Sequence, residues 1–255
     1  MPLFKTETLP HSFSMIEWQD RGIVLAVKPH GETAAVVHLL CEQQGRHAGL
    51  VAGGQGRRMA PVLQVGNLVQ ASWRARLPDH LGHYALELEH GYAARLMNSP
   101  ESLIALQSAV VLCDSALPER QSHAAIFHGS LALIEALDSD YWGEVYIKWE
   151  LLLLSELGFG LDLERCAAGG SNDHLAYVSP RSGRAVSLSA GEPYSHKLLP
   201  LPGFLAGGGE GGPSEIRQGM ELTGYFLEKN VFAPRDRPLP EIRTRLAQHF
   251  SSRAA

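Results

Sequence analysis

"HAGLVAGGQGRRMAPVLQVGNLVQASWRARL", residues 47–77, decides how the first part of this chain folds. It begins with an apolar run at Ala48–Ala52 and ends with a second run at Asn67–Arg76, in which Trp73 and Arg74 fall on opposite parities. Because side chains alternate between the two faces of a strand, each run predicts a short, half-buried strand. The glycine-rich segment between the two runs predicts a loop.

Three further apolar runs lie on either side of this stretch, at Ile23–Val27, Ala34–Cys41 and Tyr84–Leu88. Turn-forming segments separate the runs, namely "KPHGE", "EQQGR" and "LPDHLG". Five short strands within about 75 residues, joined by tight turns, predict a small closed β-barrel.

The apolar period changes to that of a helix after Gly91. Ser99 is the expected N-cap of a first helix, with Pro100 in the first helical position. The apolar residues of this helix recur at a spacing of three and four, at Leu103, Leu106, Val110, Cys113 and Leu117.

Two more helices are expected, one over about His123–Leu137 and one from about Tyr141 to a C-cap at Gly158. The run Leu151–Leu154 makes the latter hydrophobic on all sides, which predicts a central, buried helix.

The last part of the chain is more irregular. We expect a short hairpin at Leu175–Ser179 and Arg184–Ser187, around a Pro-Arg-Ser-Gly turn. Ser214 is the expected cap of a helix that runs to about Phe232, and "LPEIRTRLAQHF" predicts a final helix.

These elements predict two domains. Residues 15–92 form the barrel domain, and residues 93–255 form a mostly helical domain. We expect the helical domain to contain a hairpin insertion at about 164–190 and a flexible glycine-rich loop at about 203–214. Residues 1–14 are expected to form a flexible extension.

Composition describes an ordinary globular protein, since 45% of residues are hydrophobic and 19% are charged. The net charge of −5 does not indicate a nucleic-acid-binding protein by itself. The charge is segregated, however. Residues 43–78 contain five arginines and no Asp or Glu, so the rest of the chain has 17 basic residues against 27 acidic ones.

The three cysteines, Cys41, Cys113 and Cys166, are far apart and show no CxxC spacing. This argues against a disulfide framework or a cysteine zinc site, and it favours a reducing compartment. No apolar run reaches the roughly 18–20 residues of a membrane span, and the N-terminal residues lack the pattern of a signal peptide. We expect a cytoplasmic protein without a membrane partner.

The sequence contains no complete catalytic motif of the kinds considered below. In "GGQGRR", Arg57 and Arg58 are followed by Met and Ala, whereas a phosphate-binding P-loop needs Lys and then Ser or Thr. "GGGEGG" follows no expected strand. His80 and His83 have HxxH spacing, but they fall in a turn with no third ligand nearby in sequence. No serine lies in a GxSxG motif, and Cys166 stands alone. We therefore expect no enzyme activity, cofactor or metal.

The arginines of residues 43–78 allow two interpretations. They could be solvated side chains on a loop and on the outer face of a strand. Alternatively, they could neutralise the phosphates of a nucleic acid without reading its sequence. Strand parity places Trp73 on the face opposite Arg74, so we expect Trp73 in the barrel core rather than as a stacking platform for bases.

Four segments resemble successive parts of the bacterial RecO recombination-mediator family. Residues 45–77 are similar to its N-terminal domain. Three later segments are similar to its C-terminal domain, namely "LGFGLDLERCAAGG", "LAYVSPRSGRAVS" and "TGYFLEKNVFAPRDRPLPEIRTRL". The resemblance covers about residues 15 to 250 in the family's order, and it implies an OB-fold barrel followed by an α-helical domain.

The resemblance also implies a non-catalytic DNA repair protein, cytoplasmic and associated with the nucleoid. It implies binding of single- and double-stranded DNA, annealing of strands including those coated with single-strand-binding protein (SSB), and loading of the RecA recombinase at gaps together with RecR. The C-terminal tail of SSB is expected to dock on the helical domain. The family's DNA surface involves basic residues of the OB domain, which here are Arg46, Arg57, Arg58, Arg74 and Arg76.

One departure from the family concerns zinc. Some members carry four zinc-binding cysteines after the third long helix, whereas only Cys166 occurs in the matching region here, so we expect no zinc. An alternative to a DNA-binding mediator is a protein-interaction adaptor whose barrel contacts partner proteins and touches DNA only indirectly.

Overall fold

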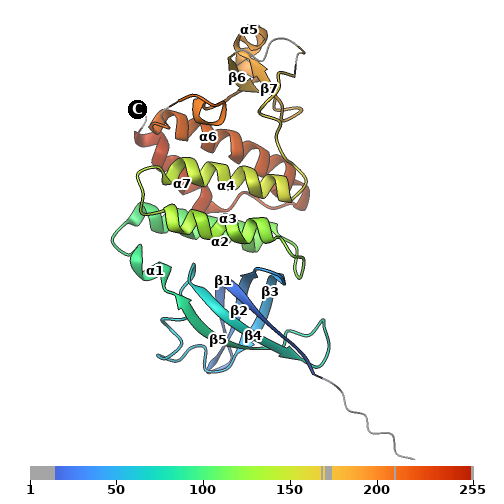
Figure 1. Ribbon diagram of the computed structural model, residues 1–255, viewed down its shortest axis with the longest axis vertical. Helices are drawn as coiled ribbons and strands as arrows, with labels where there is room; N and C mark the ends of the chain where they lie inside the picture. Colours follow the sequence, from blue (N-terminus) through green and yellow to red (C-terminus); the bar gives the residue numbers. More distant parts are fainter. Residues whose placement is uncertain (1–14, 168, 170–173, 210, 254–255) are drawn as a thin grey trace, which may run out of the picture.

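The computed structural model describes residues 15–167, 169, 174–209 and 211–253. A closed β-barrel lies at one end and a mostly helical domain is stacked on it (Figure 1). The expected fold class, an OB-fold barrel followed by a helical domain with a small sheet, is confirmed. The expected extension at residues 1–14 lies outside the described residues, as do Glu210 of the glycine-rich loop and parts of the hairpin insertion.

The barrel has five strands: β1 (Ile16–His30), β2 (Ala34–Cys41), β3 (Gly45–Val51), β4 (Leu68–Ala75) and β5 (His83–His90). Their order around the barrel is β1-β2-β3-β5-β4, and pairing of β4 with β1 closes it. All neighbouring strands are antiparallel except β3 and β5, which meet in a short parallel pair. Closure pairs β1 and β4 with each other, so that neither is left as the edge of an open sheet.

Strand β1 is much longer than the apolar run Ile23–Val27 that indicated it. Its first part pairs with β4 and alternates between exposed polar residues such as Gln19 and inward residues such as Trp18 and Asp20. Asp20 is buried, and its carboxylate tolerates this because it accepts three backbone N–H groups, one from Arg21 and two from the turn after β2. Because this part of the strand has polar residues on both faces, it contains no apolar run that would indicate a strand.

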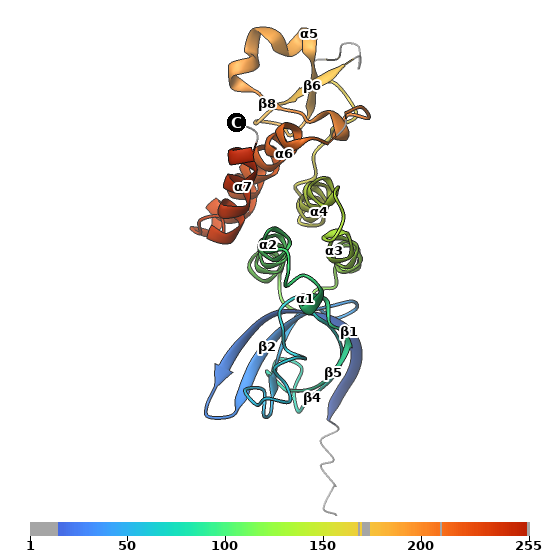
Figure 2. The same ribbon diagram turned by 90° about the vertical axis from the view of Figure 1, so that its left-hand side faces the viewer.

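The helical domain contains α1 (Tyr92–Arg95), α2 (Pro100–Ala116), α3 (Ala124–Ala136), α4 (Trp142–Glu156), α6 (Pro213–Phe226) and α7 (Glu241–Arg253). Figure 2 shows α2 and α3 next to the barrel, and α4, α6 and α7 on the side of them that is farther from the barrel. A small sheet lies at the far end, with α5 (Leu188–Gly191) beside it; its strands are β6 (Leu175–Val178), β7 (Ala185–Ser187) and β8 (Leu199–Pro200).

Two helix ends are formed by the residues that the sequence indicated. Ser99 caps α2, since its Oγ accepts the N–H of Ser102 at 3.3 Å and Pro100 follows in the first position. Gly158 ends α4 with a φ of +86°, which a residue with a side chain adopts only with strain. The next residue, Phe159, donates its N–H back to the Leu154 carbonyl at 2.8 Å, which completes a Schellman motif.

The expected cap of α6 was wrong. The helix begins at Pro213 after Gly212, and Ser214 lies inside its first turn. Proline suits the first helical position because its fixed φ is helical and the N–H that it lacks would have no partner there. The helical path also changes beyond Phe226, where a π-helical turn covers Leu227–Phe232.

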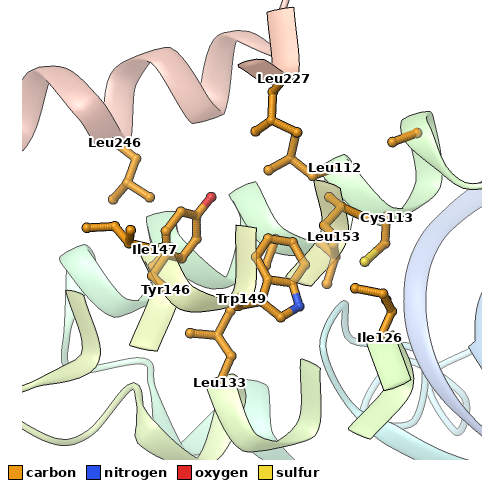
Figure 3. Packing of buried hydrophobic residues seen from close by; sticks show 14 of the residues in the cluster. Leu112, Cys113, Ile126, Leu133, Tyr146, Ile147, Trp149, Leu153, Leu227 and Leu246 are labelled. Atoms are coloured by element: carbon orange, nitrogen blue, oxygen red, sulfur yellow. The ribbon is translucent and has the colours of Figure 1, made fainter. Parts of the chain in front are cut away.

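Buried apolar residues form two clusters. One fills the barrel interior and includes Val24. The other fills the helical domain but also takes in Ile23 and Leu25, which pack with α2 on the outside of the barrel. Strand β1 is therefore buried on both faces at this point, and the barrel and the helices share one core. Figure 3 shows side chains of α2, α3, α4, α7 and the turn after α6 meeting in it.

A buried ion pair lies at the centre of the helical domain. Arg243 of α7 donates from Nε to Glu150 Oε1 at 2.5 Å and from one terminal nitrogen to Glu150 Oε2 at 2.8 Å. The same terminal nitrogen also reaches the Met220 carbonyl of α6, and Thr223 donates to Glu150. Helix α4 is thus central, as expected, but it carries a buried charge as well as leucines.

Candidate nucleic-acid interface

The directions of β3 and β4 separate the five candidate arginines into those near the helical domain and those away from it. Strand β3 starts beside the helical domain, where Gly45 lies against Gln121, and runs away from it. Strand β4 starts at Leu68, which belongs to the core shared with the helices, and also runs away. Both strands therefore end on the side of the barrel away from these starting points, although Arg120 of the helical domain reaches the loop that follows β4. We call this side of the barrel the distal end.

Arg57 and Arg58 lie in tight turns that follow β3. The Gly56 N–H donates to the Gly53 carbonyl at 2.9 Å, and Met59 donates to Gly56 at 3.0 Å. Met59 packs against the barrel core, so the neighbouring arginines point to solvent and both are exposed. Neither makes a hydrogen bond or ion pair with another described residue.

The same loop is joined to the hairpin between β1 and β2. Gln55 donates its side-chain amide to the carbonyls of Gly31 at 3.0 Å and Ala34 at 2.8 Å. This hairpin carries Lys28, an exposed cation within the segment "KPHGE" that indicated a turn. A comparison of basic residues on neighbouring hairpins would have found it.

Arg74 and Arg76 lie at the end of β4 and point outward. Arg74 sits in the middle of a row across three strands, paired with Glu17 of β1 and His83 of β5. Both arginines are exposed, and within the described residues neither forms a hydrogen bond or an ion pair. Their charge is therefore available to a partner.

Two hollows lie beside these arginines, and Arg74 and His83 line both of them. The first has a volume of about 490 Å³ and the second about 590 Å³. The first is lined by Glu17, Trp18, Gln19, Ala52, Ser72, Trp73, Arg74, His83, Tyr84 and Ala85. The second is lined by Met15, Arg74, Ala75, Arg76, His80, Gly82 and His83. Glu17 is the one acidic residue among these lining residues.

Arg46 does not join this group. It lies near the start of β3, where its guanidinium donates to Asp114 at 3.1 Å, to Glu119 at 3.1 Å and to the Leu117 carbonyl at 2.9 Å. Asp114 also lies 2.6 Å from His38 Nδ1. Burial opposes ionisation of Asp114, but His38 and Arg46 outweigh it and hold its pKa below the ordinary value.

The guanidinium N–H groups of Arg46 thus donate to acceptors within the protein, at the contact between the barrel and the end of α2. Its partners lie about 70 residues away in the chain, so sequence spacing could not reveal them. Arg46 is therefore a residue of the domain junction, and we leave it out of the candidate interface.

Trp73 lies in the barrel core, as its parity predicted, and is 2% exposed. Its ring stacks on Trp18 at a centroid distance of 5.6 Å. His47 packs edge-on against both rings and shares a hydrogen bond of 2.9 Å with the Tyr84 hydroxyl. Burial lowers the pKa of His47 to about 4, and the positive charge of Arg120 acts in the same direction. This aromatic cluster packs the barrel.

The candidate metal ligands do not come together. Among the residues that the structure describes, no three His, Cys, Asp or Glu side chains are placed to hold a metal ion. Cys166 is buried, with its Sγ 3.6 Å from Ser187 Oγ. His80 and His83 line the hollow beside Arg76. In the described part of the chain, no helix is both long and apolar enough to cross a membrane.

Comparison with known proteins covers both halves of the chain. The model of "Recombination protein O N terminal" matches residues 15–91, and that of "Recombination protein O C terminal" matches residues 97–238. The chain is 55% identical to the DNA repair protein RecO of Rhodospirillum centenum, over 92% of this chain and 95% of that protein. It is 47% identical to the protein of that name from Rhodospirillum rubrum, over 92% and 97% of the two chains. Two matching domains in this order, over a barrel and helices of the expected kind, show that the chain belongs to the RecO family.

Proposed function

We propose that this protein binds DNA during repair through the distal end of its barrel. Membership of a family whose relatives are named DNA repair proteins supports the role in repair. The observation that carries the DNA surface is the placement of Arg57, Arg58, Arg74 and Arg76. Arg57 and Arg58 are exposed in the loop after β3, and Arg74 and Arg76 are exposed at the end of β4. None of the four makes a hydrogen bond or ion pair within the described chain.

The chemistry of this surface is electrostatic. Each guanidinium that meets a phosphate releases condensed counterions, which favours binding without any reading of bases. Neutralised phosphates also repel each other less, so two strands can approach and pair on the same surface. The acidic remainder of the chain restricts the contact to the distal end. The proposed activity is therefore annealing of complementary strands.

The proposal extends to the family's partners. We propose that the protein anneals SSB-coated strands through contact of its helical domain with the SSB tail, and acts with RecR to promote loading of RecA at gaps. The shared core between barrel and helices supports this, because a partner bound to the helices is held in a set position relative to the strand on the barrel.

A salt titration tests the DNA surface. We expect log Kd for a single-stranded oligonucleotide to change with log salt by about 0.7 for each phosphate contact, or about 2.8 for four arginines. The variants Arg57→Ala/Arg58→Ala and Arg74→Ala/Arg76→Ala should each remove about 1.4 of this slope and weaken binding similarly for all sequences.

Arg237→Ala/Arg245→Ala is the matched control, because it removes the same charge from exposed positions on the helical domain. An unchanged slope in both barrel variants, or an equal loss in the control, would place the DNA surface elsewhere. Annealing of complementary strands with and without SSB, measured for the same variants, then separates the mediator from an adaptor that touches DNA only indirectly.

A further inference from the structure

The barrel wall is weakest at the seam between β3 and β5. The two strands pair in parallel only where Leu50 and Val51 meet His83 and Tyr84, whereas every other neighbouring pair of strands is antiparallel and longer. Parallel pairing is also slightly less stable for each residue than antiparallel pairing. Within the described chain, the first half of β3 therefore runs along this side of the barrel without pairing to β5.

A segment of the helical domain covers this gap. It consists of residues 117–122, between α2 and α3, and we call it the strap. Arg120 donates its backbone N–H to the Arg46 carbonyl at 2.8 Å, and Glu119 forms an isolated parallel bridge with Arg46. The Arg46 guanidinium donates in turn to the Glu119 carboxylate at 3.1 Å. The strap thus takes the place of a further strand beside the first residues of β3.

The strap also reaches the loop between β4 and β5. The Arg120 guanidinium donates to the Pro78 carbonyl and, at 2.9 Å, to the His80 carbonyl. The other side of the same loop belongs to the seam, because Leu50 donates its N–H to the Gly82 carbonyl at 3.0 Å. The strap and the seam therefore hold this loop from two sides.

Both ends of the strap are anchored in the helical domain. Leu117 at its start is 3% exposed and His123 just beyond its end is 6% exposed, whereas residues 118–122 are exposed. His123 comes directly before α3, and its Nδ1 lies 3.2 Å from a carboxylate oxygen of Glu156 at the end of α4. A displacement of α3 or of the end of α4 is therefore transmitted to the strap.

The strap and its anchor keep their positions in spite of unfavourable local features. Arg120 has a φ of +59°, in the left-handed region that a side chain makes unfavourable. His123 gives no side-chain hydrogen bond to the first turn of α3, and its Nε2 is buried without a hydrogen-bond partner among the described residues. A segment that only connects two helices does not need such strain, which is typical of segments that change position.

We propose that the strap is a conformational link between the helical domain and the barrel, with a seated and a released state. In the seated state it completes the wall beside β3 and holds the loop at residues 78–82. In the released state, which a displacement of α3 favours, the seam between β3 and β5 opens and the loop moves. Because the loop follows Arg76 closely, release also moves this exposed cation. The inference goes beyond the proposed function, and its test needs no DNA.

Hydrogen exchange of single amides in the full-length protein tests this link from both ends. Glu156→Ala removes the partner of His123, and Glu156 forms no hydrogen bond or ion pair with the barrel in the described chain. Glu119→Ala/Arg120→Gly removes the side-chain contacts of the strap with the barrel, and the glycine relieves the backbone strain. One variant thus acts on the helical end of the link and the other on its barrel end.

Both variants should loosen the seam without loosening the whole barrel. We expect the Leu50 amide, which spans the seam, to exchange about tenfold faster in each variant than in the unchanged protein. Amides that pair β1 with β4 should keep their rates. Arg217→Ala/Glu221→Ala, which removes a solvent-facing acid–base pair from α6, is the matched control and should change none of these rates.

The link should also act in the opposite direction, since coupling between two sites is reciprocal. The Phe127 amide in the first turn of α3 donates to the His123 carbonyl at 3.1 Å. It should exchange faster in Glu119→Ala/Arg120→Gly, although both substitutions lie outside α3.

Three results would overturn the proposal. The first is an unchanged Leu50 rate in Glu156→Ala, and the second is an unchanged Phe127 rate in Glu119→Ala/Arg120→Gly, since either means that the strap transmits nothing. The third is equal acceleration at the seam and between β1 and β4, which would show a general loss of stability. If Glu156→Ala does not fold, the variant of the exposed strap residues decides through Phe127.

Discussion

The guanidinium of Arg46 in β3 lies 3.1 Å from the carboxylate of Asp114 in α2, and this pair joins the barrel to the helical domain. His38 reaches the same carboxylate at 2.6 Å, so one acidic residue of the helices holds two basic residues of neighbouring strands. The junction is therefore polar at this edge and apolar where β1 meets α2.

Arg46→Ala should destabilise the protein without changing its affinity for DNA phosphates. The substitution leaves Asp114 short of a partner in a half-buried position and removes the donor to the Leu117 carbonyl, which should cost about 2 kcal/mol. Unfolding in urea measures the loss, and a salt titration of DNA binding should give an unchanged slope. A fall in slope as large as that of Arg57→Ala/Arg58→Ala would return Arg46 to the DNA surface.

Replacing Arg120 should release the loop at residues 76–82. Arg120→Gly removes the guanidinium that holds the Pro78 and His80 carbonyls, but it also relieves the backbone strain at a φ of +59°. We expect faster hydrogen exchange of the loop amides with little change in the free energy of unfolding. Arg120→Ala, which keeps the strain, should be less stable by about 1 kcal/mol. Unchanged exchange in both variants would show that the barrel alone holds the loop.

His47 should make the stability of the barrel depend on pH between about 6.5 and 4. The unfolded chain binds a proton at His47 near pH 6.5, whereas the folded barrel rejects it down to about pH 4, so lowering the pH in this window favours unfolding. At pH 4.5 this residue should reduce the free energy of unfolding by about 2 to 3 kcal/mol relative to pH 7.5.

The measurement is urea unfolding at a series of pH values, with His47→Gln as the comparison. The glutamine variant should be less stable at neutral pH because it disturbs the hydrogen bond to Tyr84, but its stability should fall less on acidification. Parallel curves for the two proteins would contradict the assignment of this pH dependence to His47.

The pair of Glu150 and Arg243 should show strong coupling. Glu150→Gln leaves the guanidinium buried without its counter-charge, which should cost about 3–5 kcal/mol. In Glu150→Met/Arg243→Met both charges are gone and apolar volume remains, so the double variant should lose less than the sum of the single changes. Additive losses in this double-mutant cycle would mean that the two residues stabilise the protein independently.

Local patterns predicted most of the secondary structure. Five apolar runs indicated the five strands, because period-two alternation reports a single buried face. Ser99 and Gly158 were predicted correctly as helix ends because their effect depends on the backbone of adjacent residues alone. The N-terminal part of β1 was not predicted, since Asp20 is a polar residue buried in the barrel. The start of α6 was placed too late, at Ser214, although Pro213 is the usual kind of residue for a first helical position.

The sequence by itself determined the class of fold, the position of Trp73 in the barrel core and the presence of unusually many arginines between residues 43 and 78. These depend on periodicity and composition, which are properties of neighbouring residues. Only the tertiary structure decided what each arginine does. Arg46 is used at the junction because Asp114 comes to it from a distant helix, whereas Arg57, Arg58, Arg74 and Arg76 remain exposed because β3 and β4 carry them away from the helices. The partner of a charge is set by long-range packing, and no spacing along the chain records it.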